Sequence, residues 1–187
     1  DDGYYITIDP IDGTKNYINK NQNFCSMVSL IFKKKPITSF IYYPLIQKYI
    51  SSFENFGSKI LDFNTNKIFK LKINKKLINF ATGGTKGIPE IKRKIILEKF
   101  NSNFKRYFIG SAGVETLMLA NNEVDFIFHG RVTAWDHSPM TLITKEAGGE
   151  VLMFDDASTF NIFSKGSILA AKNTQHWKHV KSKLNIS

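Results

Sequence analysis

Two acidic residues near the start of the chain are the side chains best suited to do chemistry. They lie in the run Asp9-Pro10-Ile11-Asp12-Gly13-Thr14, which follows the aromatic and β-branched residues 4–8. Such residues favour a buried strand over Tyr4–Ile8. The proline fixes its own backbone angle and the glycine permits a sharp bend, so the sequence predicts a tight turn on which Asp9 and Asp12 converge.

Converging carboxylates suit a hard divalent cation. Mg²⁺ prefers oxygen ligands in octahedral geometry, and it keeps waters that a substrate phosphate can displace. Two such ions about 4 Å apart can activate a water molecule and stabilise a leaving oxygen. The alternative is an Asp-Gly turn that is capped by its own side chains and has no ligand.

A second polar group stands far along the chain, in Ala134-Trp135-Asp136-His137-Ser138-Pro139. The apolar stretch that follows ends in Glu146-Ala147-Gly148-Gly149. The pattern predicts a helix over Pro139–Ala147, with the proline in its first turn, the two glycines at its end and Asp136 just before it. A carboxylate at a helix start is also favoured by the helix dipole, so an ordinary cap is the alternative for Asp136.

Taken together, the two motifs resemble those of the inositol monophosphatase-like family, which belongs to the magnesium-dependent, lithium-sensitive phosphatases. Its marks are D-P-x-D-G-T and a W-D before a helix that ends in E-A-G-G, and the resemblance extends from about Tyr4 to Ala171. It implies Mg²⁺-dependent hydrolysis of a small phosphate monoester of an inositol, sugar, nucleotide or amino alcohol. It also implies two or three Mg²⁺ ions per site in a complete protein and direct attack by water, with no covalent phosphoenzyme.

The resemblance implies a role for each matching residue. The metal ligands would be two bridging carboxylates, a backbone carbonyl and a further carboxylate, which are Asp9, Asp12, Ile11 and Asp136. The catalytic residues would be Asp12 and Thr14, the latter orienting the attacking water. The phosphate and the rest of the substrate would be bound by Gly13, Thr14, Gly110, Ser111, Ala112 and His129. For residues 110–112, a plain helix start is the alternative.

Histidines near these motifs depart from the family pattern or admit several interpretations. His129 lies seven residues before Asp136, where relatives that act on inositol phosphates carry a glutamate. A histidine there can donate to a ligand oxygen or to a second phosphate, or it can be a structural residue at a strand edge. His137 could orient Asp136, approach the substrate or be solvated at the helix start. His176 and His179 are expected at the surface.

The front of the chain departs most from the family. Relatives take another glutamate ligand, and the acid that pairs with Thr14, from an upstream helix and loop, whereas only eight residues precede Asp9. Asp1 and Asp2 should lie roughly 20 Å away along an extended strand. We therefore expect an N-terminally truncated family member that lacks the N-terminal helices and is inactive or impaired by itself. One face of its first sheet would then be exposed, which predicts a homodimer or other self-association.

The expected fold is α/β (α+β), a layered sandwich of an antiparallel sheet lobe and a mixed α/β lobe. Residues 1–77 would form a metal-binding β lobe and residues 78–187 a C-terminal α/β lobe. Further strands are predicted at Phe24–Phe32, Thr38–Tyr43, Lys48–Phe53, Ile68–Ile73, Ile78–Ala81, Phe104–Phe108, Val124–Phe128 and Ile168–Ala171. Further helices are predicted at Ile91–Phe100, Val114–Asn121 and Thr174–Leu184. The loop-like sequence Gly83-Gly84-Thr85-Lys86-Gly87 lacks P-loop spacing and is read as a connection after a strand.

The formal net charge of +10 could indicate nucleic-acid binding or merely attract an anionic substrate. Only three arginines occur, and the lysine clusters 33–35 and 75–76 fall at expected hairpin turns, which argues against nucleic-acid recognition. A non-catalytic family member that binds RNA or protein remains the alternative function. The single cysteine, Cys25, in an expected core strand, fits a reducing cytoplasm. No apolar run reaches the roughly 18 residues of a membrane span.

Overall fold

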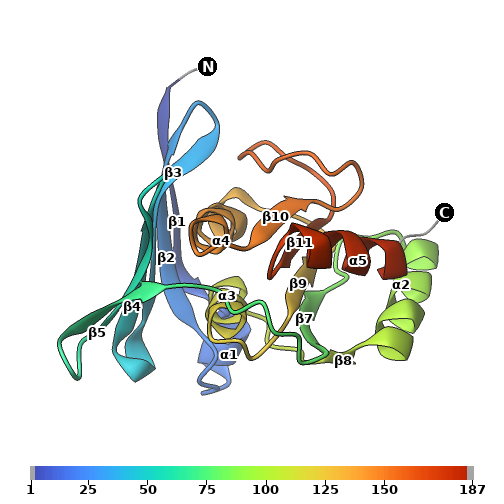
Figure 1. Ribbon diagram of the computed structural model, residues 1–187, viewed down its shortest axis with the longest axis horizontal. Coiled ribbons are helices and arrows are strands. Elements are labelled where there is room, and N and C mark those ends of the chain that lie inside the picture. The colour runs from blue at the N-terminus through green and yellow to red at the C-terminus, as the bar shows by residue number, and fades with distance from the viewer. Residues whose placement is uncertain (1–2, 185–187) are drawn as a thin grey trace.

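A computed structural model describes residues 3–184 of the chain, so Asp1 and Asp2 lie outside the described residues. Four layers follow one another across the molecule: a sheet, the helices α3 (Ala112–Ala120) and α4 (Ala134–Glu146), a second sheet, and the helices α2 (Glu90–Asn103) and α5 (Thr174–Leu184) (Figure 1). The predicted layered α/β sandwich is confirmed. No helix within residues 3–184 combines the length and the apolar character that crossing a membrane requires.

The first sheet is an antiparallel meander in which each strand pairs with the next one along the chain. Its strands are β1 (Tyr4–Asp12), β2 (Cys25–Phe32), β3 (Lys35–Tyr43), β4 (Lys48–Phe53), β5 (Gly57–Asp62) and β6 (Lys67–Leu71). The short helix α1 (Thr14–Ile18) and the 3₁₀ turn η1 (Pro44–Ile46) lie in its connections. Alternate residues of β2 are buried, as expected for a sheet with one face on the core.

The second sheet is mixed and has the strand order β10-β11-β9-β7-β8. Its strands are β7 (Phe80–Gly84), β8 (Lys105–Arg106), β9 (Phe126–His129), β10 (Glu150–Met153) and β11 (Ile168–Ala171). One apolar core fills the space between the first sheet and the helices α3 and α4, and another lies under α2 and α5. The division into two lobes at residue 77 stays a prediction. The helix α4, which follows residue 77 in the chain, packs on strands of the first sheet.

The sequence Glu146-Ala147-Gly148-Gly149 has a structural role at the end of α4. The N–H groups of Gly148 and Gly149 donate to the carbonyls of Lys145 and Thr144, which is the pattern of a Schellman cap with Gly148 in the left-handed region. Both carboxylate oxygens of Glu146 accept from backbone N–H groups in the β4–β5 turn, at 2.9 Å from Asn55 and 2.7 Å from Gly57. The motif therefore anchors the first sheet to the central helix.

A buried ion pair fixes the connection between the two sheets. Lys172 is fully buried, and its Nζ donates to the Asp125 carboxylate at 2.6 Å and to the carbonyl of Lys76 at 2.5 Å. The Asp125 carboxylate also accepts from the N–H groups of Ile78 and Asn79. Residues 75–76 thus lie in a connection between sheets, so their predicted place at a hairpin turn is wrong, whereas residues 33–34 do form the β2–β3 turn.

Packing corrects one further prediction, and the strands β5 and β10 were not predicted. His176 was expected at the surface, but it is 6% exposed and its ring lies edge-on to Phe126. The strand β5 was not predicted, because it is short, begins at Gly57 with positive φ and has only Ile60 and Leu61 as large apolar residues. His179 is exposed, as expected.

We expect Lys172→Met to lower the free energy of unfolding by about 3 to 5 kcal/mol, because it leaves Asp125 buried without its cation. Urea denaturation measures this loss. Lys178→Met, at an exposed position of α5, is the matched control and should change stability by less than about 0.5 kcal/mol. Equal stabilities of the two variants would show that the ion pair does not hold the connection.

Candidate active site

A β-bulge brings the two N-terminal carboxylates to one side of β1. Asp9 pairs with Met27 and Asp12 pairs with Cys25, so three steps along β1 match two steps along β2. In a regular strand, residues three apart face opposite sides, and one extra residue restores the same side. The predicted tight turn is therefore wrong: β1 continues to Asp12, and the bulge makes the carboxylates converge.

Asp136 reaches the same place from the first turn of α4. The helix begins at Ala134, so the predicted start at Pro139 is wrong and Asp136 lies within the helix. Pro139 is tolerated inside the helix at the cost of one backbone hydrogen bond, to the carbonyl of the half-exposed Trp135. The helix dipole favours an anionic side chain at the position of Asp136.

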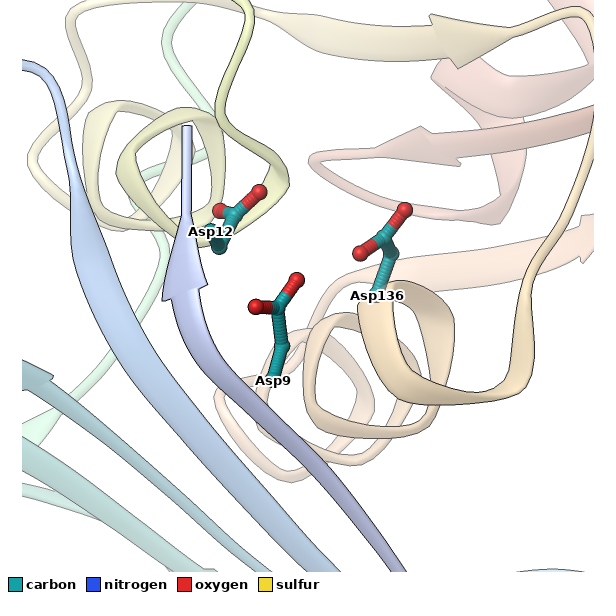
Figure 2. Close-up of side chains that lie close together, drawn as sticks. All are labelled: Asp9, Asp12 and Asp136. Atoms are coloured by element: carbon teal, nitrogen blue, oxygen red, sulfur yellow. The ribbon is translucent and has the colours of Figure 1, made fainter. Parts of the chain in front are cut away.

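The three carboxylates form one cluster. Asp9, Asp12 and Asp136 each offer an oxygen, and these oxygens lie within 4.8 Å of one another. Figure 2 shows the side chains of Asp9 and Asp12, from β1, pointing toward that of Asp136, from α4. Three hard oxygen donors at this spacing match the ligand preference of Mg²⁺.

Asp12 is the most firmly held of the three. Its Oδ2 accepts hydrogen bonds from Ser111 Oγ at 2.6 Å, from the Gly113 N–H at 2.8 Å and from Cys25 Sγ at 3.5 Å. Within residues 3–184 these donors all reach the same oxygen, which leaves Oδ1 for a cation. Burial raises the pKa of Asp12, while the bonds from Ser111 and Gly113 oppose that rise.

The position of Asp136 in the cluster shifts its pKa. Burial, together with the nearby charges of Asp12 and Asp9, raises the pKa of Asp136 to about 6. A bound cation would reverse this effect, because it favours the ionised form of each carboxylate. Asp9 is partly exposed, and its Oδ1 accepts the N–H of Ile11 at 3.1 Å.

The other residues of the first motif lie beside the carboxylates. Thr14 Oγ1 donates to the carbonyl of Ile11 at 2.8 Å. This bond joins Thr14, which is predicted to orient the attacking water, to Ile11, whose carbonyl is predicted to bind the metal. Gly13 has φ +83°, and a Cβ there would lie 2.5 Å from the carbonyl oxygen of Asn23. The predicted roles of Ile11, Gly13 and Thr14 stay predictions.

Residues 110–112 serve the site through one hydroxyl. Ser111 caps α3 by accepting the N–H of Val114 at 3.3 Å, and the same hydroxyl donates to Asp12. Asn16 joins this segment to α1, because its Nδ2 donates to the carbonyl of Ile109 at 2.9 Å. Gly110, Ser111 and Ala112 all line the cavity beside the carboxylates, where the prediction put them.

A chain of hydrogen bonds that was not predicted closes one wall of that cavity. Nε2 of His129 lies 2.6 Å from the carboxylate of Glu115, and Nδ1 of His129 lies 2.9 Å from Nε2 of His137. Nδ1 of His137 lies 3.0 Å from the carbonyl of Thr133, the residue that precedes α4. Of the three alternatives for His137, the solvated position is wrong, since the side chain is buried.

The pKa values of the two histidines in this chain are shifted in opposite directions. Burial lowers the pKa of His129, but the Glu115 carboxylate outweighs it and the net pKa is raised. Burial and the neighbouring His129 hold the pKa of His137 well below its usual range. These directions and the two short contacts fit a protonated His129 that donates to Glu115 and to His137. Both ring nitrogens of His129 are engaged by protein, and its direct contact with substrate stays a prediction.

Asp12, Asp136 and the histidine chain share a cavity of about 200 Å³. Its lining comes from both sheets and both central helices and includes Asp12, Glu115, His129, Arg131 and Asp136. Sequence reasoning missed Glu115, whose only signal is its place one turn after Ser111 at the start of a helix. It also missed the contact of Cys25 with Asp12, because the bulge that creates the contact has no sequence signature.

Comparison with known proteins places these features in context. The inositol monophosphatase family matches residues 1–185. A fructose-1,6-bisphosphatase/inositol-1-monophosphatase of Aquifex aeolicus is 29% identical over 92% of this chain and 64% of its own length. The Nus factor SuhB of Haemophilus influenzae is 27% identical over 88% of this chain and 61% of its own length. This chain therefore spans less than two thirds of either relative.

Solved structures agree on the fold. The structure of an inositol monophosphatase from Zymomonas mobilis superposes with a TM-score of 0.85 over 98% of this chain and 71% of that chain, at 16% sequence identity. Similarity at this level of identity supports the fold and not a particular activity.

Asp136→Asn should stabilise the metal-free protein at pH 8 by about 1 to 3 kcal/mol. The pKa of about 6 in the folded protein exceeds the usual aspartate value of 3.8, so the loss of stability from ionising Asp136 is absent below pH 4, grows as pH rises and is complete above pH 6. Thermal unfolding with chelator at pH 4 and pH 8 measures the difference. Glu98→Gln, at an exposed position of α2, is the control. An equal gain at both pH values would contradict the assignment.

Proposed function

The chain belongs to the inositol monophosphatase family, and on that basis we propose that it hydrolyses a small phosphate monoester with the help of Mg²⁺. The observation that carries the proposal is the convergence of Asp9, Asp12 and Asp136 within 4.8 Å. Two motifs more than a hundred residues apart supply these groups, and they are the two motifs on which the resemblance to the family depends.

The residues present fit a divalent cation. Carboxylates this close repel one another, and burial together with this repulsion raises the pKa values of Asp12 and Asp136. Placing such charges together without a cation costs free energy. Mg²⁺ bound there would supply a nucleophilic water at neutral pH and would neutralise charge on the phosphate.

The side chains of this protein would act by holding groups in place. The Oδ2 bonds from Ser111 and Gly113 fix the orientation of Asp12, so that Oδ1 is presented to the cluster. We propose that Ile11 adds its carbonyl and that Thr14 orients the attacking water. Gly13 and Thr14 would bind the phosphate through backbone N–H groups. No side chain is assigned to covalent catalysis.

The relatives support the reaction class more than the substrate. The Aquifex aeolicus relative is named as both a fructose-1,6-bisphosphatase and an inositol-1-monophosphatase. The alternative, a non-catalytic module that binds RNA or protein, is favoured by the name Nus factor given to the Haemophilus influenzae relative and by the net charge of +10. The three assembled carboxylates favour the enzyme. We propose a cytoplasmic location, which the single buried cysteine supports.

We expect Asp9→Asn and Asp12→Asn each to lower Mg²⁺-dependent phosphate release by about two orders of magnitude, as is typical when a group that stabilises transition-state charge is lost. The assay uses a panel of small phosphomonoesters with Mg²⁺ or with chelator. Mn²⁺ binding, followed by electron paramagnetic resonance, should weaken in parallel. Asp155→Asn, outside the cluster at an exposed position, is the control. Wild-type release by the Asp9 and Asp12 variants would favour the non-catalytic alternative.

We also propose self-association through the exposed face of the first sheet. Tyr4, Ile6 and Ile8 on the edge strand β1 are 67%, 66% and 61% exposed, and an apolar cavity of about 410 Å³ lies beside them. Edge strands with exposed apolar side chains tend to pair with another chain. Light scattering should show a dimer or larger species, and Ile6→Lys should shift it toward monomer. A monodisperse wild-type monomer would contradict this proposal.

A further inference from the structure

The wall of the cavity that faces the carboxylates from the second sheet is built from two glycine-containing turns. The first comprises residues 85–87 directly after β7; Gly83 and Gly84, predicted to lie in the connection, are the last residues of that strand. The second comprises Gly130 and Arg131 after β9. Lys86 and Arg131 line the cavity together with Asp12 and Asp136. The proposed hydrolysis assigns no role to either basic residue.

The two turns interlock through their backbones. The N–H of Gly130 donates to the carbonyl of Gly84 at 2.8 Å, and a Cβ at Gly130 would lie 2.8 Å from the carbonyl oxygen of Lys86. The N–H of Ile88 donates to the carbonyl of Thr85 at 3.3 Å and closes a turn around Lys86. Lys86 therefore projects from a backbone that is fixed against the neighbouring strand.

The absence of a side chain at Gly87 makes room for Arg131. Gly87 has φ +92°, and a Cβ there would lie 2.6 Å from Cβ of Arg131 and 3.2 Å from its Cγ and Cδ. The aliphatic stem of Arg131 thus lies across the first turn, so that Arg131 and Lys86 belong to one packed unit. Any side chain in place of Gly87 would displace Arg131.

The cavity lining holds one ion pair, two carboxylates of the proposed metal site and these two basic residues. Glu115 pairs with His129, and Asp12 and Asp136 belong to the proposed metal site. Both Lys86 and Arg131 are exposed, and within residues 3–184 neither forms a salt bridge. Two such cations on one wall, opposite the carboxylate cluster, favour an anionic group between them and the cluster.

We propose that Lys86 and Arg131 bind a second anionic group, a phosphate or a carboxylate, on the substrate whose phosphate ester lies at the carboxylate cluster. This inference rests on the proposed hydrolysis and narrows its substrate class to esters with a charged group at the far end. Arginine offers a planar pair of donors to an oxyanion and lysine adds a compact charge. The cavity of about 200 Å³ restricts the substrate to a small molecule.

Matched substrates test the proposal with Mg²⁺ present. Glycerol 2-phosphate and 2-phosphoglycerate carry the same ester and differ by a carboxylate, and fructose 1-phosphate and fructose 1,6-bisphosphate differ by a phosphate. We expect kcat/KM to be about tenfold higher or more for the charged member of at least one pair. The pair that shows the preference identifies the anion as carboxylate or phosphate. A ratio near one for both pairs would overturn the second anion site while leaving the hydrolase intact.

Variants that remove one positive charge test whether Lys86 and Arg131 cause the preference for substrates with a second anionic group. Lys86→Gln and Arg131→Gln should each lower the charged-to-neutral ratio about tenfold, and Lys86→Glu should reverse the preference. Lys178→Gln removes one positive charge from an exposed position of α5 away from the cavity and should leave the ratio unchanged. Equal effects of Lys86→Gln and Lys178→Gln would mean that net charge, and not this wall, selects the substrate.

A binding measurement separates this proposal from the proposed hydrolysis. In chelator, calorimetric titration with 2-phosphoglycerate, fructose 1,6-bisphosphate and their counterparts without the second anionic group should show tighter binding of the member that carries this group. Lys86→Gln should abolish the difference. If no ester is hydrolysed but this difference persists, the anion site stands and the hydrolase does not. If binding shows no difference in the wild-type protein, the anion site is wrong whatever the activity.

Discussion

Three carboxylates that repel one another are held close together, and much of the surrounding structure is needed to hold them there. Asp9, Asp12 and Asp136 bring their oxygens within 4.8 Å, and burial together with their mutual repulsion raises the pKa values of Asp12 and Asp136. Holding them there requires a bulge in β1 and donors from Ser111 and Gly113 on one side. On the other side it requires a helix whose first turn favours an anion.

The helix α4 connects the carboxylate cluster to distant parts of the molecule. Its first turn holds Asp136 and, through His137 and His129, is tied to Glu115 on α3. Its last residue, Glu146, binds the β4–β5 turn of the first sheet. One rigid element therefore sets the position of a site residue relative to both sheets, which explains why the two halves of the W-D and E-A-G-G pattern occur together.

Periodic and local signals made much of this structure predictable. The strands β4 and β11 and the helix α5 have the predicted bounds, because their patterns and end signals lie within each segment. The acidic residues of the cluster were also chosen correctly as neighbours, although their roles remain proposals. The start of α4 was misplaced, since Pro139 usually marks a first turn and here lies deeper in the helix.

What the sequence could not predict depends on register and burial. The bulge between Asp9 and Asp12 is a mismatch with β2, so it is a property of two strands. The partnership of Glu115, His129 and His137 joins three elements, and the burial of His176 depends on Phe126 in another strand. Such contacts arise only when distant segments meet.

The anchor of Asp12 bears on the order of folding. Ser111 and Gly113 lie 99 and 101 residues further along the chain, so β1 cannot present this carboxylate until α3 has docked. Closing so long a loop is slow and entropically costly, and it comes late in a nascent chain. The meander can form early from local pairings, and the carboxylate cluster is assembled only as the last layers close.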